Sequence, residues 1–249
     1  MTVINTLNET SLHRTLKNLC ALQTDGKTEQ KSGRFTCDVI AKNGEVIEIQ
    51  TSKLSALKAK IQYFLDRNTK ITIVHPLMEE KIIQTLSPEG TLLTKRKSPS
   101  KQTAYTALRS LTALHVFVGN PGFSIEFFTV SATEIRQKTK EKVQNKTKTR
   151  RHLKDYVIKD KILNSIDKTT RLTTKEDWKK LLPPAIKDQF TPPELHSALM
   201  NMDWPKNFTQ SDKKTSAKYY SLLIWFLEKA KIIEKTGQKK GKSWIYRIL

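Results

Sequence analysis

Residues 34–51 read RFTCDVIAKNGEVIEIQT and place two runs of strand-forming residues on either side of the turn Lys42-Asn43-Gly44. In each run apolar residues alternate with polar ones, and a turn that contains Asn and Gly favours a tight connection between antiparallel strands. We therefore predict a β-hairpin, and the length of its turn decides which side chains share a face.

The turn allows two registers, and they place the acidic residues of the hairpin differently. A two-residue turn at Asn43-Gly44 would pair Asp38 with Ile49 and set it on the opposite face from Glu48. A three-residue loop, with Gly44 in the left-handed region, would pair Asp38 with Glu48 instead. We favour the three-residue loop because it collects the apolar residues of both strands on one face.

The favoured register predicts a polar patch on the other face. Thr36 would lie across from Gln50, next to the paired carboxylates of Asp38 and Glu48. Adjacent carboxylates repel each other, so a fold keeps them together mainly when a cation lies between them, and hard oxygen ligands suit Mg²⁺ or Mn²⁺. Such an ion can activate water and stabilise charge on a phosphodiester. The alternative interpretation is that both carboxylates are solvated on an open hairpin face.

The hairpin lies within a longer series of predicted elements. The patterns predict a helix over 8–22 with Asn8 as N-cap, a polar loop over 27–33, the two hairpin strands, a helix that Ser52 caps, and a strand over 71–75 that ends at Pro76. In the second helix Lys53, Lys58 and Lys60 fall away from the apolar face. The order is helix, strand, strand, helix, strand.

This order and the acidic residues of the hairpin resemble the PD-(D/E)xK superfamily of restriction endonucleases, resolvases and repair nucleases. Asp38 matches the Asp of the first hairpin strand and Glu48 the acid of the (D/E)-x-K motif, whereas Gln50 stands where Lys is usual. The resemblance implies that Asp38 and Glu48 hold Mg²⁺ or Mn²⁺ and that Gln50 orients the attacking water. It also implies Glu9 as a further metal ligand and Lys53 as the displaced cation. For Glu9 the alternative is an acid that stabilises a helix N-terminus.

Beyond residue 90 the pattern predicts strands over 91–94, 114–118 and 125–130 and a helix over 103–111. Residues 134–151 contain eight Lys and Arg, repeated polar residues and few apolar ones. We expect this segment to be an exposed basic connector that is disordered when free.

The end of the chain resembles a winged-helix domain. A short helix that opens at Pro192 is followed by a longer helix over 213–230 and by a hairpin with a Gly- and Lys-rich tip at 237–242. In such domains the longer helix enters the major groove of DNA and the wing contacts phosphate. The residues implied in DNA binding are therefore Lys213, Lys214, Lys218, Lys239, Lys240 and Lys242. The alternative is a winged helix used for protein contact.

The charge distribution favours a nucleic-acid partner. The chain of 249 residues has 45 Lys and Arg against 24 Asp and Glu, a net charge of +21. Residues 1–90 contain 12 basic and 10 acidic residues, which leaves 33 and 14 for the rest. A field of this size attracts polyanions. The competing explanation is a compositional bias towards Lys in a chain that is also rich in Thr, Asn and Ile.

Other classes of protein have little support in the sequence. No apolar run approaches the ~18 residues of a membrane helix, and the N-terminus lacks a basic segment followed by an apolar one. The two cysteines form no CxxC pair and the five histidines have no metal-ligand spacing, so a zinc site or a disulfide framework is not indicated. We expect a cytoplasmic protein without a membrane partner.

The sequence thus predicts an α/β chain with a restriction endonuclease-like core, a mixed sheet flanked by helices, followed by a winged helix. The predicted boundaries are 1–133 for the nuclease-like domain, 134–152 for the basic connector and 153–249 for the winged-helix domain. The expected function is metal-dependent cleavage of double-stranded DNA, and a homodimer is compatible with it. The alternatives are a catalytically inactive DNA-binding accessory or regulatory protein and a protein-interaction subunit.

Overall fold

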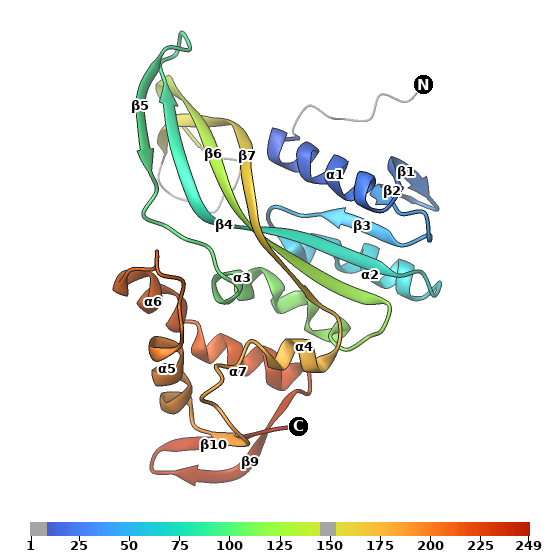
Figure 1. Ribbon diagram of the computed structural model, residues 1–249, viewed down its shortest axis with the longest axis vertical. Coiled ribbons are helices and arrows are strands. Elements are labelled where there is room, and N and C mark those ends of the chain that lie inside the picture. The colour runs from blue at the N-terminus through green and yellow to red at the C-terminus, as the bar shows by residue number, and fades with distance from the viewer. Residues whose placement is uncertain (1–8, 145–152) are drawn as a thin grey trace.

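The computed structural model describes residues 9–144 and 153–249, which form an α/β structure with a mixed sheet flanked by helices (Figure 1). The strands of this sheet are β1 (Lys27–Ser32), β2 (Phe35–Ile40), β3 (Val46–Ile49), β4 (Ile71–Leu86), β5 (Leu92–Lys97), β6 (Phe123–Val143) and β7 (Lys154–Leu172). They lie in the order β1-β2-β3-β4-β6-β7, and β5 pairs with β4. The accompanying helices are α1 (Ser11–Gln23), α2 (Lys58–Leu65) and α3 (Ala104–Leu111), with the 3-10 helices η1 (Leu54–Leu57) and η2 (Thr112–Phe117).

Helices cover both faces of the sheet, and each face has its own hydrophobic cluster. On one face α1 buries Leu12 and Leu16 in a cluster that includes Ile47 of β3. On the other face η1, α2 and α3 bury residues such as Phe64 and Leu108. Every residue of β3 is buried, because the strand lies between the two layers. Side chains of β3 therefore reach both helical layers.

The hairpin of β2 and β3 has the three-residue loop that the sequence predicts. Ile40 pairs with Val46, and the Gly44 N–H donates to the Ala41 carbonyl oxygen at 2.9 Å. Gly44 has φ +83°, in the region that glycine adopts without steric cost. The predicted register is confirmed.

The start of α1 differs from the prediction. The helix begins at Ser11 with Thr10 as N-cap, so Glu9 precedes the helix, and the predicted cap Asn8 lies outside the described residues. The Ser11 N–H donates to the carboxylate of Asp160 on β7 at 2.8 Å. A residue distant in sequence therefore supplies part of the N-terminal capping of α1.

Two strands of the sheet run through segments for which the sequence predicts no strand. Residues 27–33, predicted as a loop, contain β1, a polar edge strand without apolar alternation. The prediction that Pro76 ends a strand is also wrong, because β4 continues to Leu86. Pro76 is tolerated because the edge of β4 that faces away from β6 has no strand neighbour between Val74 and Ile82 in the described structure, so its missing N–H interrupts no ladder on that side.

The strand predicted over 114–118 is wrong, since the segment forms η2. Its buried residues Leu114 and Phe117 follow Leu111 at intervals of three, which is the repeat of a 3-10 helix. The predicted helix over 103–111 and the strands over 91–94 and 125–130 correspond to α3, β5 and β6.

The predicted connector over 134–152 is wrong for the residues that the structure describes. β6 extends to Val143, and β7, which begins at Lys154, pairs antiparallel with it as far as Leu172. The larger sheet thus includes residues 154–172, which the predicted boundaries assign to the C-terminal domain. The long polar strands have no apolar alternation because their outer halves project beyond the helices (Figure 1).

The C-terminal unit combines helices with a second sheet. Its elements are α4 (Lys175–Lys179), β8 (Gln189–Phe190), α5 (Pro192–Asn201), α6 (Gln210–Ala217), α7 (Tyr220–Lys229), β9 (Ile233–Lys240) and β10 (Ser243–Ile248). The predicted long helix over 213–230 is two helices, α6 and α7. The chain turns tightly between them, where the Tyr219 N–H donates to the Ser216 carbonyl oxygen. The predicted hairpin is present as β9 and β10, and β8 adds a third strand. Among the described helices none is long and apolar enough to cross a membrane.

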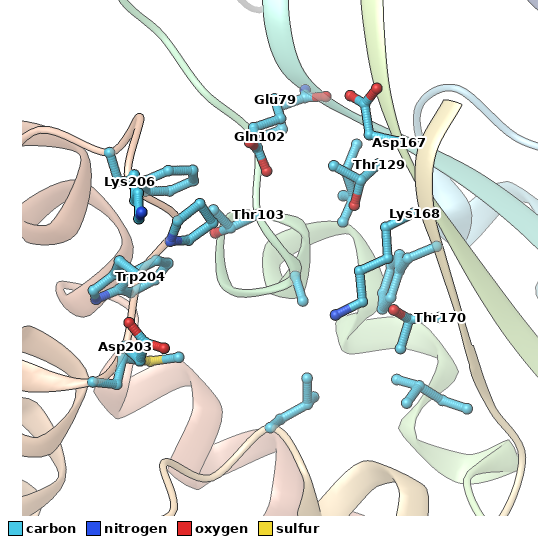
Figure 2. Close-up of a pocket in the computed structure, with 18 residues that line it drawn as sticks. Glu79, Gln102, Thr103, Thr129, Asp167, Lys168, Thr170, Asp203, Trp204 and Lys206 are labelled. Carbon is cyan, nitrogen blue, oxygen red and sulfur yellow. The ribbon is translucent and has the colours of Figure 1, made fainter. Parts of the chain in front are cut away.

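The C-terminal unit packs against α3 and η2 and shares the hydrophobic cluster of that face. Phe226 of α7 belongs to the same cluster as Leu108 of α3, and the Tyr105 hydroxyl donates to the Leu181 carbonyl oxygen at 3.0 Å. A cavity of about 690 Å³ remains between the unit and the sheet, and Lys168 of β7 extends into it (Figure 2). The two parts therefore have a common core.

Two glycines provide a test of these turns. Gly44→Ala should lower the unfolding free energy by about 1 kcal/mol through the positive φ alone, because nothing lies close to the added Cβ. In Gly33→Ala the loss of unfolding free energy should be larger, because φ is +59° and the Cβ would also overlap the hydroxyl of Tyr63. Urea denaturation of both variants measures the difference. Equal losses would show that the Tyr63 ring moves aside freely.

Candidate active site

The strands β2 and β3 separate at Asp38 and Glu48, directly after the backbone pair Val39 and Ile47. From there the acidic side chains replace the backbone ladder. The Asp38 N–H donates to Glu48 Oε1 at 3.1 Å, and the Ile49 N–H donates to Asp38 Oδ2 at 2.8 Å. The two acids thus lie across from each other as predicted, and each carboxylate binds the opposite strand.

A buried lysine occupies the gap that opens between the strands. Lys60 Nζ of α2 lies 2.6 Å from Glu48 Oε1 and donates to the Thr36 carbonyl oxygen at 2.6 Å. The Lys60 and Glu48 side chains are only 9% and 7% exposed. The predicted pairing of Thr36 with Gln50 is therefore absent from the described strands. The prediction that Lys60 points away from the core is wrong.

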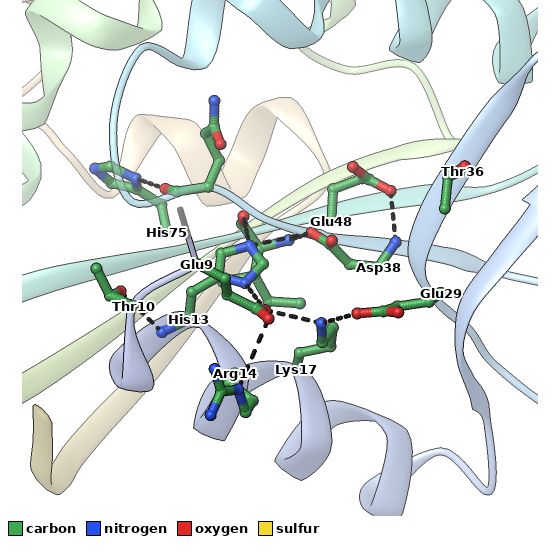
Figure 3. A network of polar contacts seen from close by, with 12 residues as sticks. Glu9, Thr10, His13, Arg14, Lys17, Glu29, Thr36, Asp38, Glu48 and His75 are labelled. Carbon is green, nitrogen blue, oxygen red and sulfur yellow. Dashed lines mark hydrogen bonds and ion pairs between the residues drawn. The ribbon is translucent and has the colours of Figure 1, made fainter. Parts of the chain in front are cut away.

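A histidine of α1 connects two carboxylates on the other side of the site. His13 Nδ1 lies 2.6 Å from Glu9 Oε1, and Nε2 lies 2.9 Å from the Ile49 carbonyl oxygen and 3.4 Å from Asp38 Oδ2 (Figure 3). A carbonyl oxygen only accepts hydrogen bonds, so Nε2 carries a proton. Glu9, the predicted third metal ligand, therefore meets Asp38 only through the imidazole of His13.

The same network continues along α1. Glu9 Oε1 lies 2.8 Å from Lys17 Nζ, which donates to Glu29 Oε1 at 2.6 Å. Lys17 is buried, so its charge is compensated mainly by these two acids. Acidic and basic groups alternate through the site, which is how a fold keeps several charges away from water.

The pKa values follow from these contacts. Burial favours a raised pKa at Asp38, but the hydrogen bond and charge of His13, the Ile49 N–H and the charge of Lys60 lower it overall. The pKa of Glu48 is raised, first by burial and then by the negative charge of Asp38, in spite of Lys60. Burial alone would lower the pKa of His13, but Asp38 and Glu9 raise it. The contacts of the site thus favour the ionised form of Asp38 and the protonated form of His13.

The remaining predicted catalytic residues lie at the end of β3. The Gln50 side-chain amide donates to the Lys53 carbonyl oxygen at 3.3 Å. Lys53 is exposed, has φ +44°, and its ammonium has no partner within residues 9–144 and 153–249. The cation beside Glu48 is therefore Lys60 and not Lys53. His75 donates from Nδ1 to the Gln50 carbonyl oxygen at 2.5 Å, and burial lowers the pKa of this histidine.

The oxygen atoms of the site suit a hard divalent cation by type. Asp38 Oδ2 and the Ile49 carbonyl oxygen both contact the N–H of His13, and the carboxylate of Glu48 lies alongside. The described residues contain no cluster of three or more His, Cys, Asp or Glu side chains that could hold a metal. Mg²⁺, however, commonly uses one or two carboxylates and keeps several waters. Two carboxylates and a carbonyl oxygen therefore fit such an ion if His13 withdraws from them.

The predicted DNA-binding lysines lie in the C-terminal unit, and their surroundings differ. Lys240 Nζ is 2.8 Å from Glu194 Oε1 of α5, so its charge is compensated. Lys239 lies over the ring of Trp244, at 4.3 Å from the centroid, and Lys242 is exposed at the tip of the hairpin. The other three occupy α6 and the turn after it: Lys213, Lys214 and Lys218. Of the three predicted wing lysines, Lys239 and Lys242 thus have no acidic partner within the described part of the chain.

The sequence did not identify His13 and Lys60 as residues of the site. His13 follows Glu9 by four residues, the spacing at which helical side chains meet, but a single histidine gives no pattern. Lys60 precedes the apolar Ile61, at the border of the apolar stripe of α2. A lysine in that position can bury its stem and present its ammonium to a carboxylate.

Comparison with known proteins assigns this part of the chain to a family. The family model described as "Domain of unknown function (DUF8091)" matches residues 10–173, about two thirds of the chain. The chain therefore belongs to this family. The matched residues run from the start of α1 to the end of β7, which are the limits of the larger sheet and its helices.

The chain is also similar to an uncharacterized protein of Treponema pallidum (strain Nichols), with 28% identity over 160 residues. The match covers 64% of this chain and 61% of that protein. No solved structure matches the chain.

The pair of Lys60 and Glu48 gives a prediction for stability. In Lys60→Met a buried carboxylate loses its cation, which should cost about 3 kcal/mol of unfolding free energy at pH 8. The pKa of Glu48, already raised in the folded state, should then rise further. A raised folded pKa adds stability that is complete below the unfolded value and is lost as the pH rises through the folded value. The loss should therefore shrink towards pH 5.

Denaturation of Lys60→Met and of Lys60→Met/Glu48→Gln at both pH values checks this prediction. The double variant keeps no charge at position 48, so its stability relative to the wild type should depend less on pH. A deficit in Lys60→Met that stays constant from pH 8 to pH 5 would contradict the assignment of the pair.

Proposed function

We propose that the protein is a metal-dependent endonuclease that cleaves double-stranded DNA and resembles the restriction endonucleases in its core. The observation that supports this most is the group formed by Asp38, Glu48 and the buried Lys60. The sequence lacks a lysine two residues after Glu48, and Lys60 brings an ammonium to the same carboxylate from α2. Two acids and a cation at separating strands are suited to hydrolysis of a phosphodiester.

In this proposal Asp38, Glu48 and the Ile49 carbonyl oxygen hold Mg²⁺ or Mn²⁺. The bound ion would supply Lewis-acid polarisation of the phosphodiester and a lowered pKa of coordinated water. Lys60 provides positive charge for the phosphoryl group in a site with little water. The side-chain oxygen of Gln50 would accept a hydrogen bond from water, while its amide nitrogen donates to the Lys53 carbonyl oxygen.

His13 has a positioning role in the same proposal. Its two ring nitrogens contact Glu9 and Asp38, so it keeps Asp38 ionised and oriented. An ion held by Asp38 and the Ile49 carbonyl oxygen would take the place that the imidazole now has between these two groups. Glu9 and Lys17 then retain the remaining charges on α1.

The C-terminal unit would hold the DNA as a winged helix. The order of α5, α6, α7 and the β9–β10 hairpin resembles that of such domains. The strong positive charge of the chain after residue 90 supports a polyanionic partner. Lys239 and Lys242 of the hairpin would contact phosphate, and Lys213 and Lys214 of α6 lie near the helix N-terminus that reads bases in this class.

A second candidate is a DNA-binding protein without catalysis. One observation favours it: both acids of the site already have cationic partners in the chain, His13 for Asp38 and Lys60 for Glu48. Such pairs neutralise the site without an added ion. Metal binding and cleavage decide between the two candidates.

Cleavage is tested with supercoiled plasmid in Mg²⁺ or Mn²⁺. The wild type should nick or cut the plasmid, and Asp38→Asn and Glu48→Gln should reduce the rate at least about a hundredfold, because electrostatic groups in hydrolytic sites contribute on that scale. Gln50→Ala should slow cleavage and leave Mn²⁺ binding by calorimetry intact. Lys53→Gln, which removes a charge away from Glu48, serves as the matched control for Lys60→Gln. A folded wild type that neither cleaves nor binds Mn²⁺ would leave the non-catalytic candidate.

DNA binding by the hairpin is tested through its salt dependence. Each lysine that contacts phosphate should add about 0.9 to the slope of log K against log salt. Lys239→Gln/Lys242→Gln should therefore lower the slope by up to about 1.8. Lys240→Gln should change it less, because Glu194 already neutralises Lys240. Fluorescence anisotropy with a labelled duplex, at salt concentrations from about 50 to about 300 mM, measures the slopes of the wild type and of both variants.

A further inference from the structure

The outer parts of four strands form an arm that projects from the body of the molecule. We define the arm as residues 79–97, 131–143 and 154–167, which belong to β4, β5, β6 and β7 (Figure 1). The strands remain paired here, with Ile83 next to Glu134 and Glu134 next to Lys161. The arm is thus an ordered, strand-paired surface, and α1 contacts it at Asp160.

One face of the arm carries a group of cations around a single acid. Arg96, Ile83, Glu134 and Lys161 are neighbours in one row across β5, β4, β6 and β7. Residues two positions along a strand share a face, so Lys81 on β4 and Arg136 on β6 belong to the same face. We call Lys81, Arg136, Lys161 and Glu134 the arm cluster.

Contacts within the arm cluster fix the cations against the sheet. Glu134 Oε1 accepts from Arg136 Nε at 2.7 Å, and Glu134 Oε2 lies 3.6 Å from Lys81 Nζ. The Arg136 guanidinium also lies over the ring of Tyr156, at 4.4 Å from its centroid. These contacts hold Arg136 and Lys81 in defined positions beside Glu134.

The arm cluster is poorly hydrated and carries excess positive charge. The Lys81 and Arg136 side chains are 20% and 16% exposed and that of Glu134 is 6% exposed. Three cations of the cluster share its one carboxylate, which leaves the cluster itself with a net charge of two positive units. Burial, together with the charge of Lys81, lowers the pKa of Lys161 although Glu134 opposes this. Half-buried cations that outnumber their counter-ions are costly to a fold.

Two acids that are neighbours of the cluster residues in sequence, Glu80 and Asp160, have other partners. Glu80 pairs with Lys97 at 3.9 Å, and Asp160 binds the N-terminus of α1. Arg96, in the same row, is exposed and has no ion pair within the described part of the chain, so it adds a further cation at the edge. An anion with several oxygen acceptors would satisfy these donors.

We propose that the arm cluster binds a phosphate group of a nucleic-acid backbone. The identification of the anion as a nucleic-acid phosphate rests on the proposed function, in which the partner is DNA. The positive charge of the cluster and its burial are observed independently of that proposal. Arginine beside lysine suits phosphate because the guanidinium offers parallel N–H donors and the ammonium a second positive charge. The arm would thus be a second DNA-contacting surface, in addition to the hairpin of the C-terminal unit.

Binding is tested on the full chain with Asp38→Asn, so that no cleavage interferes, and without divalent ions. Arg136→Gln/Lys161→Gln should weaken binding of a labelled duplex about tenfold at 150 mM salt and lower the salt slope by about 0.9 for each phosphate that the arm no longer neutralises. Lys58→Gln/Lys187→Gln removes the same charge from exposed positions and is the control. Equal affinity and slope in the two double variants would overturn the proposal.

Two further measurements separate this proposal from the proposed function. Pyrophosphate should raise the melting temperature of the parent protein and should have little effect on Arg136→Gln/Lys161→Gln. If the parent binds no duplex but shows this response, the arm cluster is a phosphate site and the DNA partner is wrong. If pyrophosphate stabilises the parent and Arg136→Gln/Lys161→Gln equally, the cluster does not bind phosphate.

Glu134→Gln should change phosphate binding in the opposite direction. It therefore keeps the proposal testable even if Arg136→Gln/Lys161→Gln fails to fold. It removes the internal acid and retains the three cations, so pyrophosphate should bind more tightly and stabilise this variant more than the parent. Circular dichroism shows whether the strands are intact. Weaker pyrophosphate binding by a folded Glu134→Gln would overturn the proposal.

Discussion

The parallel pairing of β4 with β6 is the interaction on which the other parts of the structure depend. The two strands remain neighbours from Ile71 and Phe123 in the core to Leu86 and Gln137 in the arm. β3 joins one edge of this pair and β7 the other, and α3 lies in the connection between the two strands. Because the C-terminal unit packs on α3, its place is also set by this pairing.

The candidate active site results from the point where this regular pairing stops. β3 keeps its parallel pairing with β4 as far as Ile49, but β2 pairs with β3 only at Val39 and Ile40. At Asp38 and Glu48 the buried backbone groups of the two strands therefore need other partners. Asp38, Glu48 and Lys60 provide them. The same side chains that complete the hydrogen bonding of the sheet are those proposed for chemistry. Stability and activity are therefore expected to change together when any of them is replaced.

The hairpin could be predicted from the sequence because one face had to be apolar. Once that condition was applied, alternation fixed the loop length and placed Asp38 across from Glu48. The contacts of His13 and Lys60 could not be derived in this way, since they depend on how α1 and α2 cross the sheet. β1 was missed because an edge strand that covers no core needs no apolar alternation, and β7 because most of its residues are exposed or half-buried at the edge of the sheet and few of them, such as Leu172, reach the core. The helix break at Tyr219 has no Gly or Pro to mark it.

Consecutive residues of β7 connect two distant regions of the molecule. Asp160 holds the N-terminus of α1, and Lys161 belongs to the arm cluster. His13 lies two residues into α1 from Ser11 and contacts Asp38. The contact of Asp160 with Ser11 therefore places the arm cluster and the imidazole of His13 at the two ends of one continuous set of contacts, so that any change in the position of β7 at Asp160 would also act on the first turn of α1.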